Sequence, residues 1–271
     1  MCCVMGTKLV VVGGGRMGEA LVGGLLAAGW AGAGDLCVIE ASAERRAQLT
    51  ERFPGVAVAE TPPEAEGVVL AVKPGDIEAA AGAVADAGYG RALSIAAGVP
   101  LAILEAALSA ETSQRPVLRA MPNTPALVGA GAAAVAPGTW AEEDDLSWAE
   151  AILGALGLVV RLPEHLLDAV TGLSGSGPAY LFLVAEALTD AGVLVGLPHD
   201  VSSSLAVQTL LGSARLLAET GETASSLRAA VTSPGGTTAA GLRVLEAAGV
   251  RSALMEAVAA ATERSRQLGQ H

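Results

Sequence analysis

The chain has 271 residues, of which 52% are hydrophobic, 3% are aromatic and 16% are charged, and its formal net charge is −12. This length suits one large domain or two smaller ones, with enough apolar residues for a sizeable core. A strongly negative surface repels phosphate backbones and therefore argues against nucleic-acid binding. Because aromatic residues are so few, small and aliphatic residues must fill the core, which favours a helix-rich protein.

The mean hydropathy of +0.51 would also suit a membrane protein. However, the longest uncharged run, residues 120–141, is interrupted by prolines and glycines, so no helix of about 20 residues could cross a bilayer there. The first apolar run follows Lys8 and ends in glycines, unlike a signal peptide. Cys2, Cys3 and Cys37 show no disulfide framework or metal-ligand spacing. We expect a soluble cytoplasmic protein without a metal site.

Short apolar runs alternate with helical stretches over residues 8–161. The strand candidates are Leu9–Val12, Leu36–Ile39, Val68–Val72, Ala92–Ile95 and Val117–Met121. Continuous apolar runs of this kind are typical of parallel strands that are covered on both faces. Helical stretches such as Met17–Ala28 and Ile77–Ala87 lie between them. The order predicts an α/β fold with a Rossmann-like, doubly wound parallel sheet.

The pattern changes after Arg161, and no convincing strand run follows. Long stretches at helical spacing cover Ala179–Val195, Val201–Glu219 and Val250–Gln267, separated by Gly- and Pro-containing breaks. We therefore predict a domain boundary near Leu162. A dinucleotide-binding domain would cover residues 1–162, and an all-helical domain would cover residues 163–271.

The segment Gly13–Gly18 reads G-x-G-x-x-G between the first apolar run and the first helical stretch. In such a turn Gly13 would allow the tight bend, Gly15 the approach of a pyrophosphate, and Gly18 close packing of helix and strand. Free N–H groups at the helix start would face the anion. In a chain with 34 glycines the pattern alone could be a turn that binds nothing. Its strand–turn–helix context nevertheless predicts a dinucleotide site.

Two groups of charged residues bear on the choice of cofactor. Glu40 follows the second strand at about the offset of a ribose contact, and a carboxylate there favours a free 2′-hydroxyl and hence NADH. Arg45 and Arg46 could instead clasp the 2′-phosphate of NADPH, or form a solvated helix face. Lys73, at the end of a strand, should point toward the ligand crevice. There it could contact the cofactor or complete a local ion pair, and we favour both roles over proton transfer.

Several further strings follow in order along the chain. They are Ala71–Pro74, Ser94–Gly98, Arg119–Pro125, Thr171–Tyr180, Ser233–Thr238 and Gly241–Glu246. This ordered set resembles the pyrroline-5-carboxylate reductase family, whose members carry out the last step of proline biosynthesis. The resemblance covers nearly the whole chain, and the last two strings are its most specific part.

The resemblance implies NAD(P)H-dependent reduction of 1-pyrroline-5-carboxylate to L-proline by hydride transfer to the ring C=N bond. The residues expected to bind NADPH or NADH are Val12, Gly13, Gly14, Gly15, Arg16, Met17, Gly18, Glu40, Ala71, Val72, Lys73, Pro74, Ala96, Ala97 and Gly98. Those expected around the substrate are Glu164, Ser233, Gly235, Gly236, Thr237 and Thr238, with Thr238 as the catalytic residue. The family also implies a homodimer formed through the helical domain, with dimers building rings such as a decamer. Each active site would then lie between one nucleotide domain and the helices of the partner chain.

The residue types suit imine reduction. A protonated imine accepts hydride without a strong enzymic acid, whereas carbonyl reductases usually supply His, Tyr or Lys. The chain has three histidines and two tyrosines. We expect His199 at a helix start, Tyr180 in a core, and His165 either exposed or functional. The Thr238 hydroxyl could bond the ring nitrogen while amides at the same helix start hold the carboxylate, although an ordinary helix cap would look similar.

The chain departs from the family pattern at a few places. Where relatives often carry His-Pro and Lys-Asp, it has Thr223-Ala224 and Arg228-Ala229, and Arg16 replaces an Asn. These changes leave cofactor preference and the loop before Val231 open. Ser174–Pro178 could mimic a nucleophile motif, but no His–Asp partner is evident. We expect its small residues to let the helix approach a ligand or the partner chain.

Three other functions compete with this hypothesis. A hydroxyacid dehydrogenase of similar plan would need a lysine in the first long helix of the second domain, and residues 164–214 contain none. An imine reductase for another ring is poorly separated by sequence. A nucleotide sensor without catalysis would not need the intact loop at residues 234–238.

Overall fold

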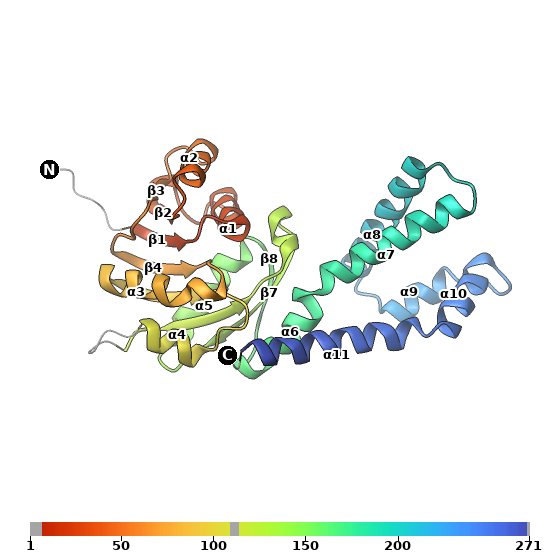
Figure 1. The fold of residues 1–271 in the computed structure, drawn as a ribbon. Coiled ribbons are helices and arrows are strands. Elements are labelled where there is room, and N and C mark those ends of the chain that lie inside the picture. Colours follow the sequence, from red (N-terminus) through yellow and green to blue (C-terminus); the bar gives the residue numbers. More distant parts are fainter. Residues whose placement is uncertain (1–6, 109–113, 270–271) are drawn as a thin grey trace. The chain divides into compact units, whose positions relative to one another are not determined.

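The computed structural model describes residues 7–108 and 114–269 (Figure 1). The chain divides into two compact units, one containing residues up to Ser176 together with those from Ala260 onward, the other Gly177–Ala259. This division lies beyond residue 162 because Leu167 is buried in a core of the first unit. The predicted domain boundary near Leu162 therefore stays a prediction, and the two units are described separately.

The first unit is built on an eight-stranded sheet of order β3-β2-β1-β4-β5-β6-β7-β8. The strands are β1 Thr7–Val12, β2 Leu36–Ile39, β3 Ala57–Ala59, β4 Ala65–Leu70, β5 Tyr89–Ser94, β6 Val117–Met121, β7 Gly131–Pro137 and β8 Gly157–Arg161. All neighbours pair in parallel except β6 and β7, which are antiparallel.

Alternate strand residues feed two separate cores, one on each face of the sheet. In β1, Leu9 and Val11 belong to one core, and Val10 and Val12 belong to the other. The helices of the first face are α1 Arg16–Ala27, α2 Ala43–Arg52 and α5 Glu143–Gly154, and those of the second are α3 Ile77–Ala87, α4 Leu101–Leu108 and α6 Leu167–Val170. Because both faces are covered, the predicted doubly wound α/β fold is confirmed.

All five predicted strands are present, two with the predicted bounds (β2 and β6) and three with shifted ends, but three others were missed. The strand β3 has only three residues at one edge of the sheet. Most of β7 is alanine and follows the 3₁₀ turn Thr124–Val128, so its sequence reads as an irregular Pro- and Gly-rich run. At the other edge of the sheet, Leu158 and Val160 of β8 are exposed. This strand therefore does not have the continuous burial that is typical of a central parallel strand.

The second unit is helical, as predicted. It contains α7 Gly177–Leu194, α8 His199–Thr220, α9 Ala224–Ala230, α10 Thr237–Ala247 and the first part of α11 Val250–Leu268. The helices α7 and α8 approach closely where the Ser202 hydroxyl donates to the Thr189 carbonyl at 2.7 Å. Large apolar side chains nevertheless remain exposed, such as Phe182 at 65% and Leu194 at 87%. Among the described residues, none of this unit belongs to either of the two large hydrophobic cores.

One continuous helix in the described residues, Glu164–Leu194, is long and apolar enough to cross a membrane by length and composition alone. It has 31 residues, and only 6% of the residues in its most apolar 18-residue window are buried. The longest uncharged run of the sequence, residues 120–141, instead forms the end of β6, a 3₁₀ turn and β7. Most side chains in the apolar window of Glu164–Leu194 are not buried within this chain.

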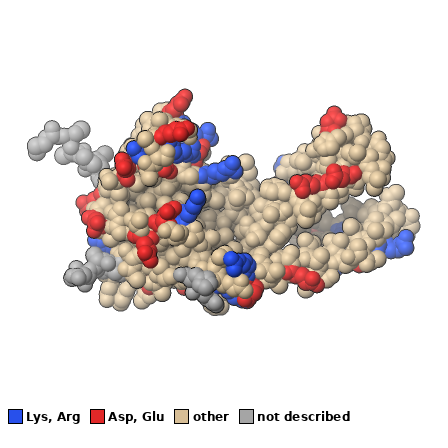
Figure 2. Space-filling view, in the orientation of Figure 1, with Lys and Arg blue, Asp and Glu red and all other residues tan. Residues whose placement is uncertain are grey.

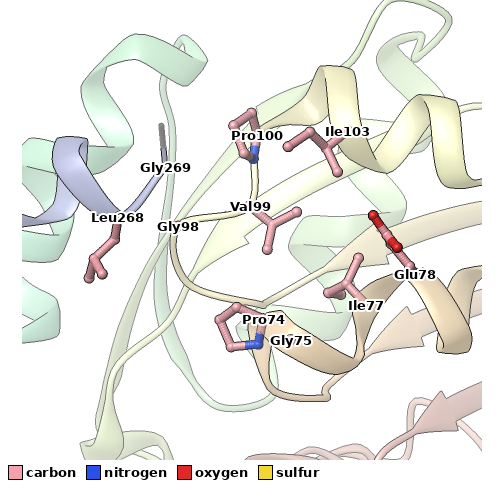
Figure 3. Close-up of a pocket in the computed structure, with 10 residues that line it drawn as sticks. All are labelled: Pro74, Gly75, Ile77, Glu78, Gly98, Val99, Pro100, Ile103, Leu268 and Gly269. Carbon is pink, nitrogen blue, oxygen red and sulfur yellow. The ribbon is translucent and has the colours of Figure 1, made fainter. Parts of the chain in front are cut away.

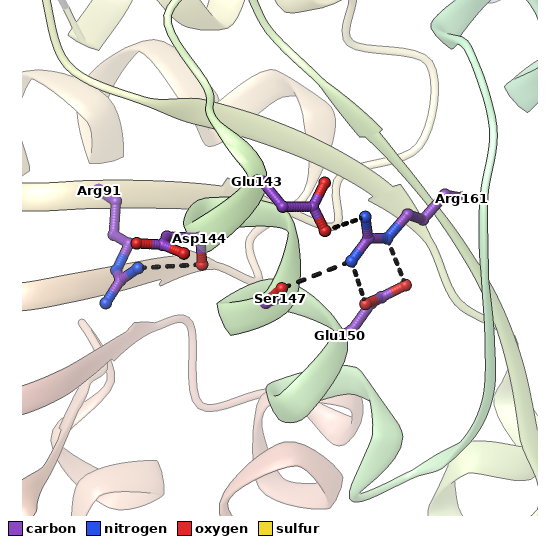
Figure 4. Close-up of polar contacts among 6 residues, drawn as sticks. All are labelled: Arg91, Glu143, Asp144, Ser147, Glu150 and Arg161. Atoms are coloured by element: carbon purple, nitrogen blue, oxygen red, sulfur yellow. Dashed lines mark hydrogen bonds and ion pairs between the residues drawn. The ribbon is translucent and has the colours of Figure 1, made fainter.

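The edge strand β8 is tied to α5 through Arg161 (Figure 4). Its Nε and Nη2 atoms each donate to Glu150 at 2.7 Å, and Nη1 donates to Glu143 at 2.5 Å. The hydrogen bonds from Arg161 lower the pKa of Glu150. These polar contacts of Arg161 thus add to the packing of Val159 against the core in holding the strand at the edge of the sheet.

We predict that Arg161→Met lowers the melting temperature at pH 7 by roughly 1–3 °C, the size expected of exposed ion pairs in a domain of this length. A lowered folded-state pKa means that the pair stabilises above the ordinary carboxyl pKa of 4.5 and that this contribution is lost as the pH falls below it. The difference in melting temperature should therefore shrink in acid and in high salt. Thermal melts of both proteins between pH 3 and 7 check this, with Arg264→Met as the control, because this exposed arginine donates to Gln267 and forms no ion pair with the described residues. An equal difference at pH 3 and 7 would contradict it.

Candidate functional site

The turn between β1 and α1 depends on three glycines with different surroundings. Gly13 has a φ of +106°, and a Cβ there would lie 2.5 Å from the carbonyl oxygen of Ala71. A Cβ on Gly18 would overlap the carbonyl oxygen of Gly13, so only glycine lets α1 pack so close to β1. A Cβ on Gly15 would meet nothing within 4 Å. Two of these glycines are thus required by the fold, and Gly15 is not.

The start of α1 is open toward solvent. Gly15 is the N-cap, is exposed, and makes no side-chain capping bond. The first N–H groups of a helix have no intrahelical partner and carry the positive end of its dipole. Since no side chain covers this N-terminus, it suits an anion such as a phosphate.

A pocket of about 610 Å³ lies at the carboxyl ends of β1, β2 and β4. The predicted cofactor residues that line it are Val12, Gly13, Gly15, Glu40, Ala71, Val72 and Lys73. Pro74 and Gly98 line a separate pocket of about 380 Å³ (Figure 3). Gly14, Arg16, Met17, Gly18, Ala96 and Ala97 line neither of these two pockets.

The sequence analysis missed part of this lining. Glu60 and Thr61 follow β3, which was not recognised, and the half-buried Ala80 and the exposed Ala83 lie on α3. Recognition of β3 would have found Glu60, because residues just beyond the carboxyl ends of parallel strands gather at the ligand crevice.

Glu40 is held in place by two backbone amides. Its Oε2 accepts from Gly14 N at 3.1 Å and its Oε1 from Ser42 N at 2.9 Å. The carboxylate thus joins the end of β2 to the glycine turn. It also closes the space beside Gly14, where a Cβ would meet Leu49 and Glu40.

Arg46 is bound to the pocket wall. Its Nη1 donates to the carbonyls of Glu40 at 2.8 Å and of Ala41 at 2.7 Å, and its Nη2 lies 3.5 Å from Glu60. Arg46 therefore does not form a simple solvated helix face, and Glu60 partly offsets its charge.

Arg45 is likewise engaged. Its Nε donates to the Gly14 carbonyl at 2.8 Å, and the same guanidinium forms an ion pair with Glu19. Among the described residues, Lys73 forms no ion pair, so the alternative of a local ion pair is not seen. Lys73 is the cation that lines the pocket, together with the acidic residues Glu40, Glu60 and Asp76.

The second predicted group lies at the start of α10 in the helical unit. Gly236 is the N-cap, and Gly235 has a φ of +70°. The Gly236 amide donates to the Ser233 carbonyl at 3.0 Å, which closes a tight turn. Thr237 and Thr238 are the first two residues of the helix, and Thr238 is half-buried. The predicted helix start is confirmed, and its N-terminal amides suit a carboxylate.

Glu164 belongs to the first unit and is bound to its neighbours. Its Oε1 accepts from Arg119 Nη1 at 2.9 Å and from the Leu101 amide at 2.6 Å. It is therefore fixed to β6 and to the start of α4. Glu164 was predicted as a substrate-binding residue only, and neither of these two contacts was predicted from the sequence.

The remaining candidate residues, two histidines, one tyrosine and the segment Ser174–Pro178, do not line either of the two pockets described above. His165 is exposed, His199 is the first residue of α8, and the Tyr180 hydroxyl lies 3.5 Å from the Ala257 carbonyl. Near Ser174 the helix approaches its own sheet, because a Cβ on Gly175 would lie 2.7 Å from Met121. We expected the small residues of Ser174–Pro178 to let the helix approach a ligand or the partner chain. At Gly175 the helix instead packs closely against Met121 of β6.

Comparisons with known proteins agree with this arrangement. Residues 164–268 match the family model described as "Pyrroline-5-carboxylate reductase dimerisation", and residues 8–98 match "NADP oxidoreductase coenzyme F420-dependent". Relatives named pyrroline-5-carboxylate reductase from Synechocystis sp. and Mycobacterium tuberculosis are each 45% identical to the chain. The first alignment covers 98% of this chain and 99% of the relative, and the second covers 96% of both. The chain belongs to the pyrroline-5-carboxylate reductase family.

Solved structures of this family have the same fold. A pyrroline-5-carboxylate reductase from Coxiella burnetii is 35% identical, with a TM-score of 0.89 over 97% of this chain and 98% of that one. The enzyme from Plasmodium falciparum, solved with NADP bound, is 29% identical, with a TM-score of 0.82 over 97% and 98%. The pyrroline-5-carboxylate reductase dimerisation model begins at Glu164 and covers all the helices of the second unit.

We predict that alanine substitution destabilises the protein at one glycine of the turn and has little effect at another. Gly18→Ala should lower the free energy of unfolding by about 1–3 kcal/mol, because the new methyl group must push α1 away from the Gly13 carbonyl. Gly15→Ala should change it by less than about 0.5 kcal/mol, because its Cβ meets nothing, its φ of −68° is allowed for alanine, and the restricted unfolded chain offsets the poorer N-cap. Urea unfolding of the two variants and the wild type measures both effects. Equal destabilisation by both substitutions would contradict this account of the turn.

Proposed function

We propose that the chain catalyses the NAD(P)H-dependent reduction of 1-pyrroline-5-carboxylate to L-proline, the last step of proline biosynthesis. The observation that carries the proposal is the 45% identity over nearly the whole chain to relatives named pyrroline-5-carboxylate reductase. The glycine turn of the first unit and the Ser233–Thr238 loop of the second supply the two kinds of anion site that a dinucleotide and a carboxylate substrate need.

The pocket beside the glycine turn fits NADPH or NADH. The open helix start at Gly15 and the room above it suit a pyrophosphate. Glu40 and Ala41 at the end of β2 line the same pocket, where the adenosine ribose lies in dinucleotide folds. When bound, the reduced nicotinamide supplies the hydride. The protein's part is to hold the phosphates on the amides of the turn and to orient the ring through the loops after β4 and β5.

At the substrate, the chain positions and neutralises rather than donates a strong acid. The amides of Thr237 and Thr238 at the start of α10 can hold the substrate carboxylate, with Ser233, Gly235 and Gly236 shaping the turn. The Thr238 hydroxyl can then bond the ring nitrogen. Because protonated pyrroline is already electrophilic, orientation accounts for most of the rate gain.

The helical unit favours a homodimer. Its apolar side chains are widely exposed, and few charged side chains lie on its visible face in Figure 2. An apolar surface of this extent needs a partner, and the dimerisation model matches these helices. Burial against a second copy also covers the apolar helix Glu164–Leu194 without a membrane. We place the enzyme in the cytoplasm, and larger rings such as a decamer of the chain would be built from the dimers.

The main test is turnover. NADPH and NADH oxidation should follow the addition of pyrroline-5-carboxylate to the wild-type protein. Thr238→Ala should lower kcat roughly 10- to 100-fold, because about 1.5–3 kcal/mol is typical of a hydrogen bond to a charged group. The cofactor dissociation constant should change little.

Thr220→Ala, at the exposed end of α8, is the matched control and should behave as wild type. Unchanged kinetics in Thr238→Ala would remove Thr238 from the catalytic role. Cofactor binding without any turnover in the wild type would indicate a nucleotide sensor instead.

Cofactor preference should respond to Glu60. Glu60→Gln removes the carboxylate 3.5 Å from Arg46 and leaves that guanidinium more available to a 2′-phosphate. The ratio of NADPH to NADH affinity should rise roughly two- to fivefold, the equivalent of an exposed ion pair. Fluorescence titration with both cofactors measures the ratio, and Glu51→Gln on α2 is the control of equal charge change. A ratio that stays constant in Glu60→Gln would mean that Arg46 does not face the ribose.

A further inference from the structure

Arg119 is a buried charge on the sheet. It lies in β6, is 9% exposed, and is paired in register with Ser94 of β5. Glu164 is its ion-pair partner, at 2.9 Å. A buried guanidinium without a partner would be strongly destabilising, so the pair fixes the position of the Glu164 carboxylate.

The same carboxylate oxygen has a second task. Glu164 Oε1 also accepts from the amide of Leu101 at 2.6 Å, and Leu101 is the first residue of α4. A carboxylate at a helix N-terminus satisfies a free amide and interacts favourably with the helix dipole. Glu164 therefore anchors the start of α4 to β6 from a distant point in the sequence.

The segment that this anchor holds is the loop between β5 and α4. At its first end, the Ala96 amide donates to Ser94 Oγ at 3.3 Å. At its other end Pro100 directly precedes the anchored Leu101. Between them Gly98 has a φ of +75°, so the loop bends sharply. The loop is thus fastened on both sides by polar contacts.

This loop borders the pocket lined by two of the predicted cofactor residues, Pro74 and Gly98. Gly98, Val99 and Pro100 form one wall of the pocket of about 380 Å³, and Pro74 and Gly75 face them from the loop after β4 (Figure 3). Ala96, Ala97 and Gly98 are the predicted cofactor contacts of this loop. A shift of α4 would therefore move them.

We propose that Glu164 is a positioning residue for cofactor binding: held by Arg119, it fixes the start of α4 and with it the 96–100 loop against which the cofactor binds. The proposal rests on the proposed function for the identity of the cofactor. It differs from a role as a substrate ligand, which the family resemblance alone implies, because the effect passes through the Leu101 amide.

The test compares Glu164→Ala with Glu164→Gln. One oxygen of Glu164 accepts both hydrogen bonds, so the amide oxygen of glutamine can keep both, whereas alanine loses them. With NADPH or NADH and no substrate, fluorescence titration should show a dissociation constant raised roughly five- to tenfold in Glu164→Ala. It should be restored to within about twofold of wild type in Glu164→Gln. Glu66→Ala, at the opposite end of β4, is the control.

The variant Glu164→Ala leaves Arg119 buried without a partner and can reduce stability. The double variants Arg119→Met/Glu164→Ala and Arg119→Met/Glu164→Gln remove that charge. Only the first of them should bind cofactor weakly, because only it lacks an acceptor for Leu101. All titrations are made well below the measured melting temperatures.

Steady-state kinetics separate the two roles of Glu164. Positioning predicts a higher KM for cofactor in Glu164→Ala, with the KM for pyrroline-5-carboxylate nearly unchanged. A raised substrate KM in both Glu164→Ala and Glu164→Gln, with cofactor affinity at the wild-type value, would overturn the proposal. Absence of turnover in the wild type would remove the proposed function, while the cofactor titrations would still decide the role of Glu164.

Discussion

The close approach of α1 to β1 determines where every group of the nucleotide-binding unit can lie. Gly18 rests against the carbonyl of Gly13, and Gly13 in turn lies against the backbone of Ala71 at the end of β4. These contacts bring the open start of α1 to the point where β1 and β4 separate, which is the topological switch point of the sheet. A larger residue in place of either glycine would have to push these backbone segments apart and so shift the start of α1 away from that crevice.

Charge then refines a site that packing has placed. Glu40 accepts from the amide of Gly14 while Arg45 donates to the carbonyl of the same residue, so the two peptide groups on either side of Gly14 are both held. Such a network stiffens the turn before any ligand arrives, which reduces the entropy lost on binding. It also means that the residues expected nearest the ribose, Glu40, Arg45 and Arg46, already have partners within the protein. If the ribose lies there, we expect cofactor preference to depend on the balance among these charges rather than on Glu40 alone.

The features that sequence could predict are those with a local signature. The glycine turn, the five buried strands and the start of α10 each follow from residues within a short window, and each is present. The strands β3, β7 and β8 have no such signature, since one is very short, one is mostly alanine and one is half-exposed. Their existence depends on neighbours in the sheet.

Contacts between distant residues were equally inaccessible. Glu60 reaches the pocket only because β3 pairs with β2, and Glu164 meets Leu101 and Arg119 only because α4 and β6 pack together. The family resemblance pointed to Glu164 as a substrate residue, but no local pattern in the sequence indicates either set of contacts.

The two units illustrate different solutions to the same requirement for burial. The sheet unit fills two cores with leucine, valine and alanine, whereas the helical unit leaves comparable side chains uncovered. Its fold and its association are therefore expected to be inseparable, as in obligate dimers that have no stable monomer. Glu164 stands at the first residue of the segment matched by the dimerisation model, yet its carboxylate is bound within the sheet unit. If Glu164 positions the loop, a shift at the start of that segment would reach the Leu101 amide through this carboxylate. Arg119 opposes such a shift, because it holds the same carboxylate oxygen on β6. This restraint favours a cofactor site that is formed before substrate binds.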